Sequence, residues 1–268
     1  MQLRRVVLIA VVAAGILAGC AKPDTQTPPT PQEAVAAASA RTTAVGSARI
    51  SRSIAWFDAA GNQVGPPMRI EGVIDFTHHL ARLDTTTAKP PAGTSSTPVL
   101  TQVYTKNAIY WRSLGLEKVA KKHWLKLDLT TLPEDRRPSV EAMVGLGQAG
   151  VNPARSLQQL RTVVNVAEVG REQLRGVDTR HLKGSVKGPF GIQVVEVWLD
   201  SEDRTRRIRT TTPAPVPAVP GPTQAGLPPP PASFVTTTDY YDFGTKVDVQ
   251  VPPDSDATDF EDFGSKSP

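Results

Sequence analysis

Two long blocks of this chain alternate apolar and polar residues at every second position, and this period limits the fold more than any other feature. M-R-I-E-G-V-I-D-F at residues 68–76 and Q-V-V-E-V-W-L-D at residues 193–200 show it most clearly. Successive side chains of a strand point to opposite faces of a sheet, so such segments predict β-strands with one buried face. Short turns such as A-A-G-N and S-E-D-R separate the strands and indicate antiparallel neighbours.

Apolar residues are spaced as in helices before the first strand block and again between the two blocks. An alanine-rich segment from Pro31 to Val45 predicts the first helix, because proline is favoured in a first helical turn. Pro153 opens another candidate helix in the same way. The helical faces between the blocks carry Val140, Met143, Val144, Leu157 and Leu160. The sequence therefore predicts an α+β fold, a large curved antiparallel sheet with helices covering one face.

The chain has a single cysteine, Cys20, at the end of a basic and then apolar N-terminus. M-Q-L-R-R, a run of twelve apolar residues and two small residues precede it, which is typical of a secretory signal peptide over residues 1–19. The apolar run is shorter than the ~20 residues that a membrane span needs. L-A-G-C resembles the bacterial lipobox. The alternatives are a plain secretory signal with an incidental cysteine, or an uncleaved anchor.

The lipobox resemblance implies that the thiol of Cys20 carries a diacylglyceryl group. It also implies that the new N-terminus is acylated with a fatty acid such as palmitate. Two or more acyl chains hold a protein stably on a bilayer, at ~0.8 kcal/mol per buried methylene. We therefore expect a lipid-anchored protein on the outer face of the cell membrane. The lone thiol is then consumed, which leaves no cysteine for a disulfide.

Composition divides the chain into four parts. The signal peptide is followed by the lipidated cysteine and a polar, proline-rich tether over residues 20–32. One domain is expected over residues 33–252, and an acidic, disordered tail over residues 253–268. Residues 213–232 hold nine of the 25 prolines and predict an extended insert, because proline cannot pair inside a sheet.

Charge and motifs exclude several classes of function. The 30 basic and 26 acidic residues nearly balance, without a basic run interleaved with aromatics, so nucleic acid is not an expected partner. The four histidines lack metal-ligand spacing. G-L-G-Q-A-G at residues 145–150 lacks the preceding strand of a dinucleotide fingerprint and predicts a helix end and a loop. We expect no cofactor, no metal, no catalytic residue and no enzymatic activity; a dispersed catalytic triad is the weak alternative.

Several segments, together with the lipobox and the order of elements, carry a family resemblance. They are E-G-V-I-D-F, Y-T-K-N-A-I-Y-W, W-L-K-L-D, V-E-V-W-L-D and D-F-G-T-K-V-D-V-Q-V-P. Over Glu33 to Pro252 the chain resembles the actinobacterial LppX/LprAFG lipoproteins, relatives of the LolA-type lipoprotein carriers. The resemblance implies an incomplete β-barrel whose concave face is covered by helices, with an apolar cavity for acyl chains. It also implies that the protein binds a lipid or lipoglycan for carriage or chaperoning across the cell envelope.

The wall of such a cavity is expected to come from apolar residues of both the sheet and the helices. The sheet would supply Ile70, Ile74, Phe76, Val103, Ile109, Val195, Val197 and Leu199. The helices would supply Val140, Met143, Val144, Leu157 and Leu160. The alternative is a closed core in a non-enzymatic accessory or sensor lipoprotein that binds an envelope protein, because any sheet needs alternating apolar residues to bury one face. In both cases we expect a monomer.

Overall fold

The computed structural model describes residues 28–86, 99–132, 134, 153–188, 191–214, 231–260 and 262. The helical elements are α1 (Pro31–Thr43), α2 (Leu114–Ala120), α4 (Pro153–Gln159) and the 3-10 helices η1 (Leu160–Thr162) and η2 (Asp254–Asp256). The strands of the first block are β1 (Ser47–Phe57), β2 (Met68–Asp75), β3 (Leu80–Thr86), β4 (Leu100–Tyr104), β5 (Ala108–Arg112) and β6 (Trp124–Asp128). The later strands are β7 (Val164–Leu174), β8 (Val177–Gly188), β9 (Gly191–Leu199), β10 (Thr205–Pro213), β11 (Ser233–Tyr241) and β12 (Ala257–Asp259).

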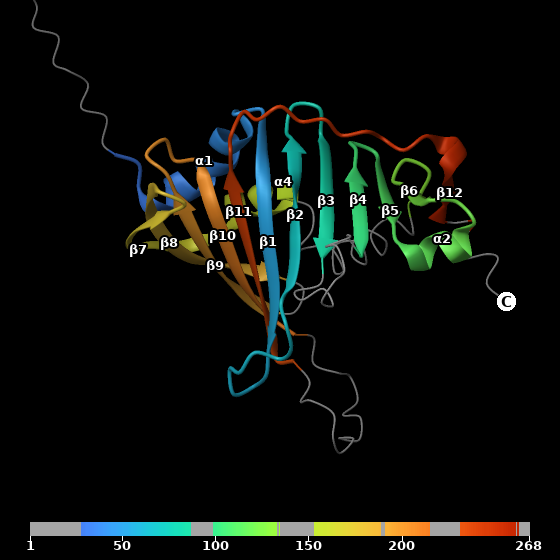
Figure 1. Ribbon diagram of the computed structural model, residues 1–268. Helices are drawn as coiled ribbons and strands as arrows, with labels where there is room; N and C mark the ends of the chain where they lie inside the picture. Colours follow the sequence, from blue (N-terminus) through green and yellow to red (C-terminus); the bar gives the residue numbers. More distant parts are fainter. Residues whose placement is uncertain are drawn as a thin grey trace, which may run out of the picture.

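These strands form one twelve-stranded sheet in the order β12-β6-β5-β4-β3-β2-β1-β11-β10-β9-β8-β7 (Figure 1). Each sequence block is a meander of antiparallel neighbours, and β1 joins the two blocks by pairing with β11. The pairing of β12 with β6 is parallel. The sheet is open, with β12 and β7 at its two edges, so it does not close into a barrel. The predicted α+β fold with a large antiparallel sheet is confirmed.

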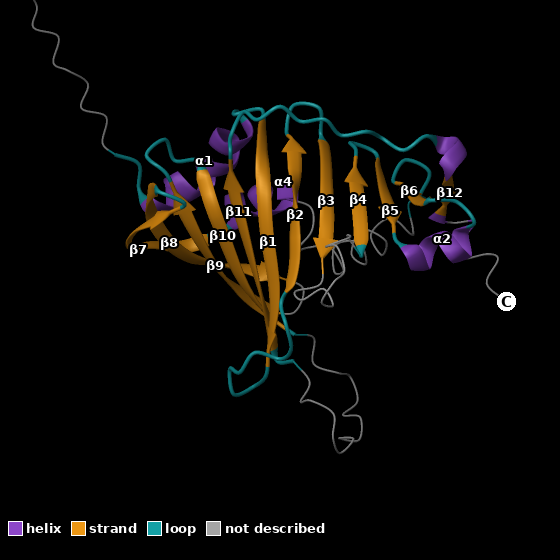
Figure 2. Ribbon diagram, in the orientation of Figure 1, coloured by secondary structure: helices purple, strands orange, loops and turns teal. Residues whose placement is uncertain are grey.

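The helices α1 and α4 lie on one face of this sheet, behind the strands in the view of Figure 2. Thr30 and Glu33 form a capping box at the start of α1, and Pro31 occupies its first turn. Helix α1 packs on β7 and β10, and η1 and α4 lie beside it. None of the described helices is long and apolar enough to cross a membrane.

The structure corrects two of the predicted boundaries. The tail was expected to be disordered from Pro253, but residues 254–256 form η2 and residues 257–259 form β12, whose backbone pairs with β6. Helix α1 begins at Pro31, where the sequence predicts a helix start, so it includes the last two residues of the tether predicted over residues 20–32. The side chain of Gln32 donates to the carbonyl oxygen of Val163 at 2.6 Å, which attaches this helix to the sheet.

Other segments for which the sequence makes predictions lie wholly or partly outside the described residues. Residues 1–27, which include Cys20 and most of the predicted tether, are among them. So are residues 215–230 of the proline-rich insert; at its ends, the amide of Ala214 donates to the carbonyl oxygen of Ala232 at 2.8 Å. The three predicted helical residues Val140, Met143 and Val144 also lie outside the described part.

Candidate functional site

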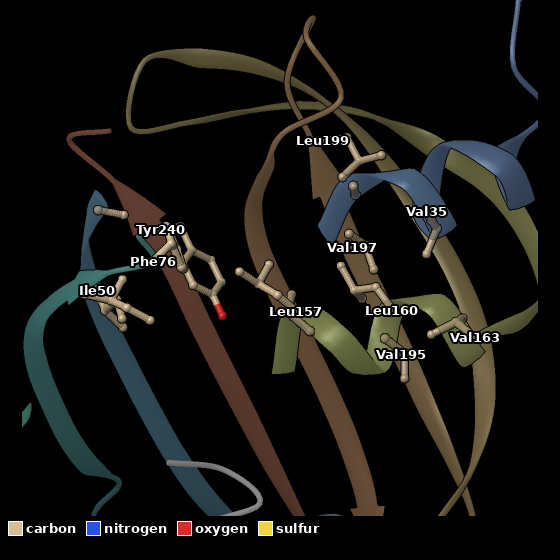
Figure 3. Close-up of a cluster of buried hydrophobic side chains, with 14 of the residues drawn as sticks. Val35, Ile50, Phe76, Leu157, Leu160, Val163, Val195, Val197, Leu199 and Tyr240 are labelled. Atoms are coloured by element: carbon tan, nitrogen blue, oxygen red, sulfur yellow. The ribbon is translucent and has the colours of Figure 1, made fainter. Parts of the chain in front are cut away.

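One face of the sheet carries a continuous cluster of buried apolar side chains, and Figure 3 shows α1, α4 and η1 contributing Val35, Leu157 and Leu160 to it. The cluster contains residues of nine strands, β1–β5 and β8–β11, together with α1, α4 and η1. It forms because alternate residues of each strand share this face, as the antiparallel registers require. This is the face on which the sequence analysis placed a lipid cavity.

Most of the predicted wall residues that the structure describes meet in this cluster. Their exposed fractions are all between 0% and 8%. They are Ile70, Ile74, Phe76, Ile109, Val195, Val197 and Leu199 from the sheet and the β2–β3 turn, with Leu157 from α4 and Leu160 from η1. The sequence therefore identified which residues share the face, while the existence of a cavity among them stays a prediction.

Val103 does not belong with the other predicted wall residues. It is buried on the opposite face of the sheet in a second cluster with Ala108, Tyr110 and Ala257, against which Val249 of the segment before β12 packs. Its neighbour Tyr104 points to the first cluster instead. Because β4 is buried on both faces, alternation in V-L-T-Q-V-Y-T could not show which residues face the helices.

A charged side chain, Arg52, interrupts the apolar face at its centre. Arg52 stands on β1 between Ile50 and Ile54, and only 2% of it is exposed. Its Nε donates to the hydroxyl of Thr238 on β11 at 2.8 Å, and its Nη2 donates to the hydroxyl of Ser156 on α4 at 3.4 Å. Its Nη1 is buried and has no hydrogen-bond partner among the residues that the structure describes.

Two tyrosines lie close enough to Arg52 to interact with it electrostatically. Burial lowers the pKa of the Arg52 guanidinium, and the interactions with Tyr240 and Tyr104 oppose that effect. Burial also raises the pKa of both phenols well above the usual range, and the Arg52 charge partly offsets the increase. Both tyrosines are therefore neutral at physiological pH, so neither supplies a negative charge to balance the arginine.

Polar side chains surround Arg52 on the same face. The sheet register places Thr238 directly beside Arg52, Thr236 beside Ile54, and Thr210 beside Thr236. One row further along the strands, Gln193 accepts a hydrogen bond at 3.0 Å from Gln159 of α4. Thr85, Gln102 and Thr212 are also buried. This part of the face is consequently amphipathic: a wide apolar surface joins a polar strip that contains one cation.

The opposite face carries a polar groove of about 520 Å³. Its lining includes Glu172, His181, Glu196, Trp198 and Arg209. The imidazole of His181 stacks on Trp198 with 4.1 Å between ring centroids, and lies within 3.6 Å of Glu172 and 3.4 Å of Glu196. The indole nitrogen of Trp198 donates to Glu172.

The charges of this groove are largely paired with one another. Arg207 donates to both oxygens of Asp239, at 2.6 and 2.9 Å, which raises the pKa of Arg207. Arg209 lies 3.4 Å from Glu196. Trp198 is only 5% exposed, so its ring is not available to stack on a ligand. We interpret these residues as the paired polar surface of the sheet. Among the described residues there is also no group of three side chains able to hold a metal ion.

The sequence itself contains a signal for the burial of Arg52, which was not among the predicted wall residues. In S-A-R-I-S-R-S-I-A-W, Ala48, Ile50, Ile54 and Trp56 occupy alternate positions and so share a face. Arg52 falls on the same positions. An arginine in the middle of an otherwise apolar strand face is rare, since isolated buried charges are costly.

Comparison with known proteins finds remote similarity to lipoproteins. No family model matches it. A curated protein of Streptomyces coelicolor, described as a candidate lipoprotein, is 27% identical over 162 residues, which are 58% of this chain and 49% of that protein. The chain thus spans about half the length of this curated relative.

The solved structures with a similar arrangement include two mycobacterial lipoproteins. LppX of Mycobacterium tuberculosis has a TM-score of 0.46 at 11% identity, covering 81% of this chain and 98% of LppX. LprF of Mycobacterium bovis has a TM-score of 0.45 at 12% identity, covering 83% and 96%. A LolA-superfamily protein of Nitrosomonas europaea has a TM-score of 0.30 at 9% identity, covering 85% and 96%. These are the classes of protein that the sequence resembles, but the likeness is too remote to assign a function.

Proposed function

We propose that this protein is a membrane-anchored, extracytoplasmic lipoprotein that binds a lipid or lipoglycan between its sheet and its helices. The anchor is the acylated Cys20 of the L-A-G-C motif. The ligand lies against the apolar face that α1 and α4 cover, and the bound lipid is carried or chaperoned across the envelope. No catalytic step and no cofactor enter this function.

The observation that carries the proposal is the extent of the apolar face. Its cluster crosses nine neighbouring strands, which at about 4.8 Å per strand is a width of about 40 Å. The described helices on this face are α1, of 13 residues, and α4, of 7 residues, and each has a diameter of about 10 Å. A surface of this width under two short helices can accommodate acyl chains without rearrangement of the sheet.

A second candidate function is supported by how tightly the cluster is packed. Leu157, Leu182 and Leu199 are each 0% exposed. If the face is filled by its own side chains, the protein is an accessory or sensor lipoprotein that binds an envelope protein. The polar groove around Glu196 and Arg209 would then be the surface for a partner of complementary charge.

Native mass spectrometry separates the two candidates. The full-length chain carrying Cys20→Ser would be purified without detergent, so that no acyl group of its own contributes mass. A lipid-binding protein gives a reproducible added mass that organic solvent extracts and that fragments as a lipid.

The control for this experiment is the same protein after delipidation with solvent and refolding. We expect it to regain the added mass when incubated with a lipid extract of bacterial membranes. A bare protein mass in both preparations, with no uptake of a fluorescent fatty acid, would contradict the proposed function and favour the closed core.

A further inference from the structure

We propose that Arg52 is the binding site for the anionic group of an amphiphilic ligand, so that the protein selects acyl lipids whose head carries a carboxylate or phosphate. This inference deepens the function proposed above and rests on it. It assigns a chemical class to the ligand and one residue to its recognition. The first observation behind it is the buried, unpartnered Nη1 of Arg52 on the covered face.

The charge of Arg52 has no anion to balance it among the described residues. The neighbouring carboxylate in the sheet, Asp239, points to the opposite face, where Arg207 binds it. The partners of Arg52 within hydrogen-bond distance are two neutral hydroxyls, those of Thr238 and Ser156. A guanidinium remains protonated in proteins, so a positive charge is buried here against neutral groups.

Such an arrangement is unfavourable unless something else compensates for it. Removing an ion from water costs several kcal/mol, and attraction to an anion is what usually offsets this cost. A structural role alone would be met more cheaply by a neutral side chain of similar length. An anionic ligand that binds at Nη1 would provide the missing charge and a strong, short hydrogen bond.

The surroundings of Arg52 match an amphiphile better than a free anion. On one side lies the polar strip of Thr236, Thr238 and Thr210, whose hydroxyls can bind the oxygens of a head group. On the other lies the apolar cluster, with Ile50 and Tyr240 in the neighbouring row and Leu157 of α4 in the same cluster (Figure 3). A ligand with its charge at Arg52 would therefore place its acyl chain over apolar side chains.

The test compares ligands that differ only in the head group. Full-length Cys20→Ser protein, delipidated, would be titrated at pH 8 with myristate, myristyl alcohol and tetradecyl phosphate by displacement of a neutral pyrene-labelled acylglycerol. Inorganic phosphate alone is added as a fourth ligand. We expect myristate and tetradecyl phosphate to bind at least about tenfold more tightly than the alcohol, because the alcohol cannot form a charged hydrogen bond with Arg52.

The variant Arg52→Met removes the charge and keeps a long side chain. We expect it to bind myristate and myristyl alcohol equally tightly, and we expect both ligands to raise its melting temperature by the same amount. Arg49→Met is the matched control: it changes the same strand on the opposite face, where Arg49 is exposed and pairs with Asp242 at 3.5 Å. Arg49→Met should keep the preference of the parent protein.

The outcomes separate this inference from the function on which it rests. Equal binding of myristate and its alcohol by the parent protein, or an unchanged preference in Arg52→Met, would overturn the role of Arg52 and leave lipid binding intact. Binding of inorganic phosphate as tight as that of tetradecyl phosphate would show a site for free anions instead. If none of the acyl ligands displaces the probe, the proposed function fails as well. Should Arg52→Met not fold, the comparison in the parent protein decides alone.

Discussion

Asp200 shows how a single buried carboxylate holds the turn between β9 and β10. It accepts hydrogen bonds from the backbone amides of Glu202 and Arg204, both at 3.0 Å. The Nε atoms of Arg204 and Arg206 donate to its second oxygen at 2.9 and 2.8 Å. Burial raises the pKa of this carboxyl, but the hydrogen bonds outweigh it, so the pKa is lowered overall. The ionised form is therefore the one that the fold stabilises.

We expect Asp200→Ala to lower the free energy of unfolding by about 3 kcal/mol at pH 7, because two arginines and two amides lose their partner. The stabilisation is complete above the pKa of an unfolded aspartate, about 3.9, and is lost as the pH falls through the lower pKa of the folded state. Urea denaturation between pH 7 and pH 2 measures both effects. The difference in the free energy of unfolding between parent and variant should become smaller toward pH 2. A difference that does not change with pH would contradict the argument from ionisation.

Gly184 on β8 lets Val163 and Val164 approach this strand more closely than a residue with a Cβ atom would allow. A Cβ atom there would lie 2.7 Å from a methyl carbon of Val163 and 2.8 Å from the carbonyl oxygen of Val164. We expect Gly184→Ala to destabilise the protein by about 1–3 kcal/mol through overpacking. Gly115→Ala in α2 is the control, since its nearest neighbour would be 3.9 Å away, and it should be neutral or stabilising. Thermal unfolding of both variants gives the comparison, and equal melting temperatures would refute it.

At this scale the sequence revealed which residues are apolar and buried. It did not reveal, for every one of them, to which face of the sheet the side chain points. Ile70 and Ile74 could be placed because β2 alternates between buried and more exposed residues, and Val197 because every second residue of β9 from Gln193 to Leu199 is buried. Val103 could not, because both faces of β4 are buried, and its second face belongs to the cluster against which Val249 of the segment before β12 packs. The burial of Arg52 could have been predicted from its position in β1. The lack of an anion beside it could not, because that depends on where carboxylates far away in the sequence point.

Among the elements, α1 is held to the sheet by polar contacts near both of its ends. Near its start Gln32 binds Val163, and near its end Thr42 is 0% exposed. The hydroxyl of Thr42 donates to the carbonyl oxygen of Ala38 and accepts from the amide of Thr205 at 2.8 Å. The first residue of β10 thus depends on a helix side chain for its backbone hydrogen bond. These contacts fix the helix along the sheet more definitely than its small alanine side chains could.

We expect Thr42→Val to lower the free energy of unfolding by about 1–3 kcal/mol, because the buried amide of Thr205 is left without an acceptor. Thr43→Val is the matched control: its hydroxyl binds only carbonyl oxygens of its own helix, those of Ser39 and Ala40. Chemical denaturation of both variants measures the difference, and hydrogen exchange at Thr205 should accelerate only in the first. An equal decrease in the free energy of unfolding in the two variants would argue against a specific contact between α1 and β10.

The elements were predictable to the extent that they are long and periodic. Helix α1 follows from its alanines and its capping residues, and the meanders follow from alternation and turn residues. Strand β12 was missed because three residues, Ala257–Asp259, are too few to show a period, and the acidic composition around them favours disorder. Its parallel pairing with β6 is a long-range contact, about which the local sequence contains no information.

For the whole molecule, the proposed location depends on one residue, Cys20, which lies outside the described part of the chain. We expect the full-length protein to be found in the membrane fraction and Cys20→Ala to be released from it, because acylation of Cys20 is the proposed attachment. Cell fractionation with immunoblotting measures this, and Ala18→Ser, which keeps a small residue before the cysteine, is the control. A Cys20→Ala protein that stays on the membrane would refute the lipobox.

The pairing of β1 with β11 also determines when this chain can complete its fold. Residues 47–57 must pair with residues 233–241 before the two meanders become one sheet, and β6 gains its outer neighbour only when residues 257–259 pair with it. Such non-local pairings make folding slow, since a long loop has to close before they contribute. The centre of the sheet therefore closes only when nearly the whole polypeptide has left the ribosome. During that interval the apolar faces are exposed, so an unfinished chain is open both to export in an unfolded state and to aggregation.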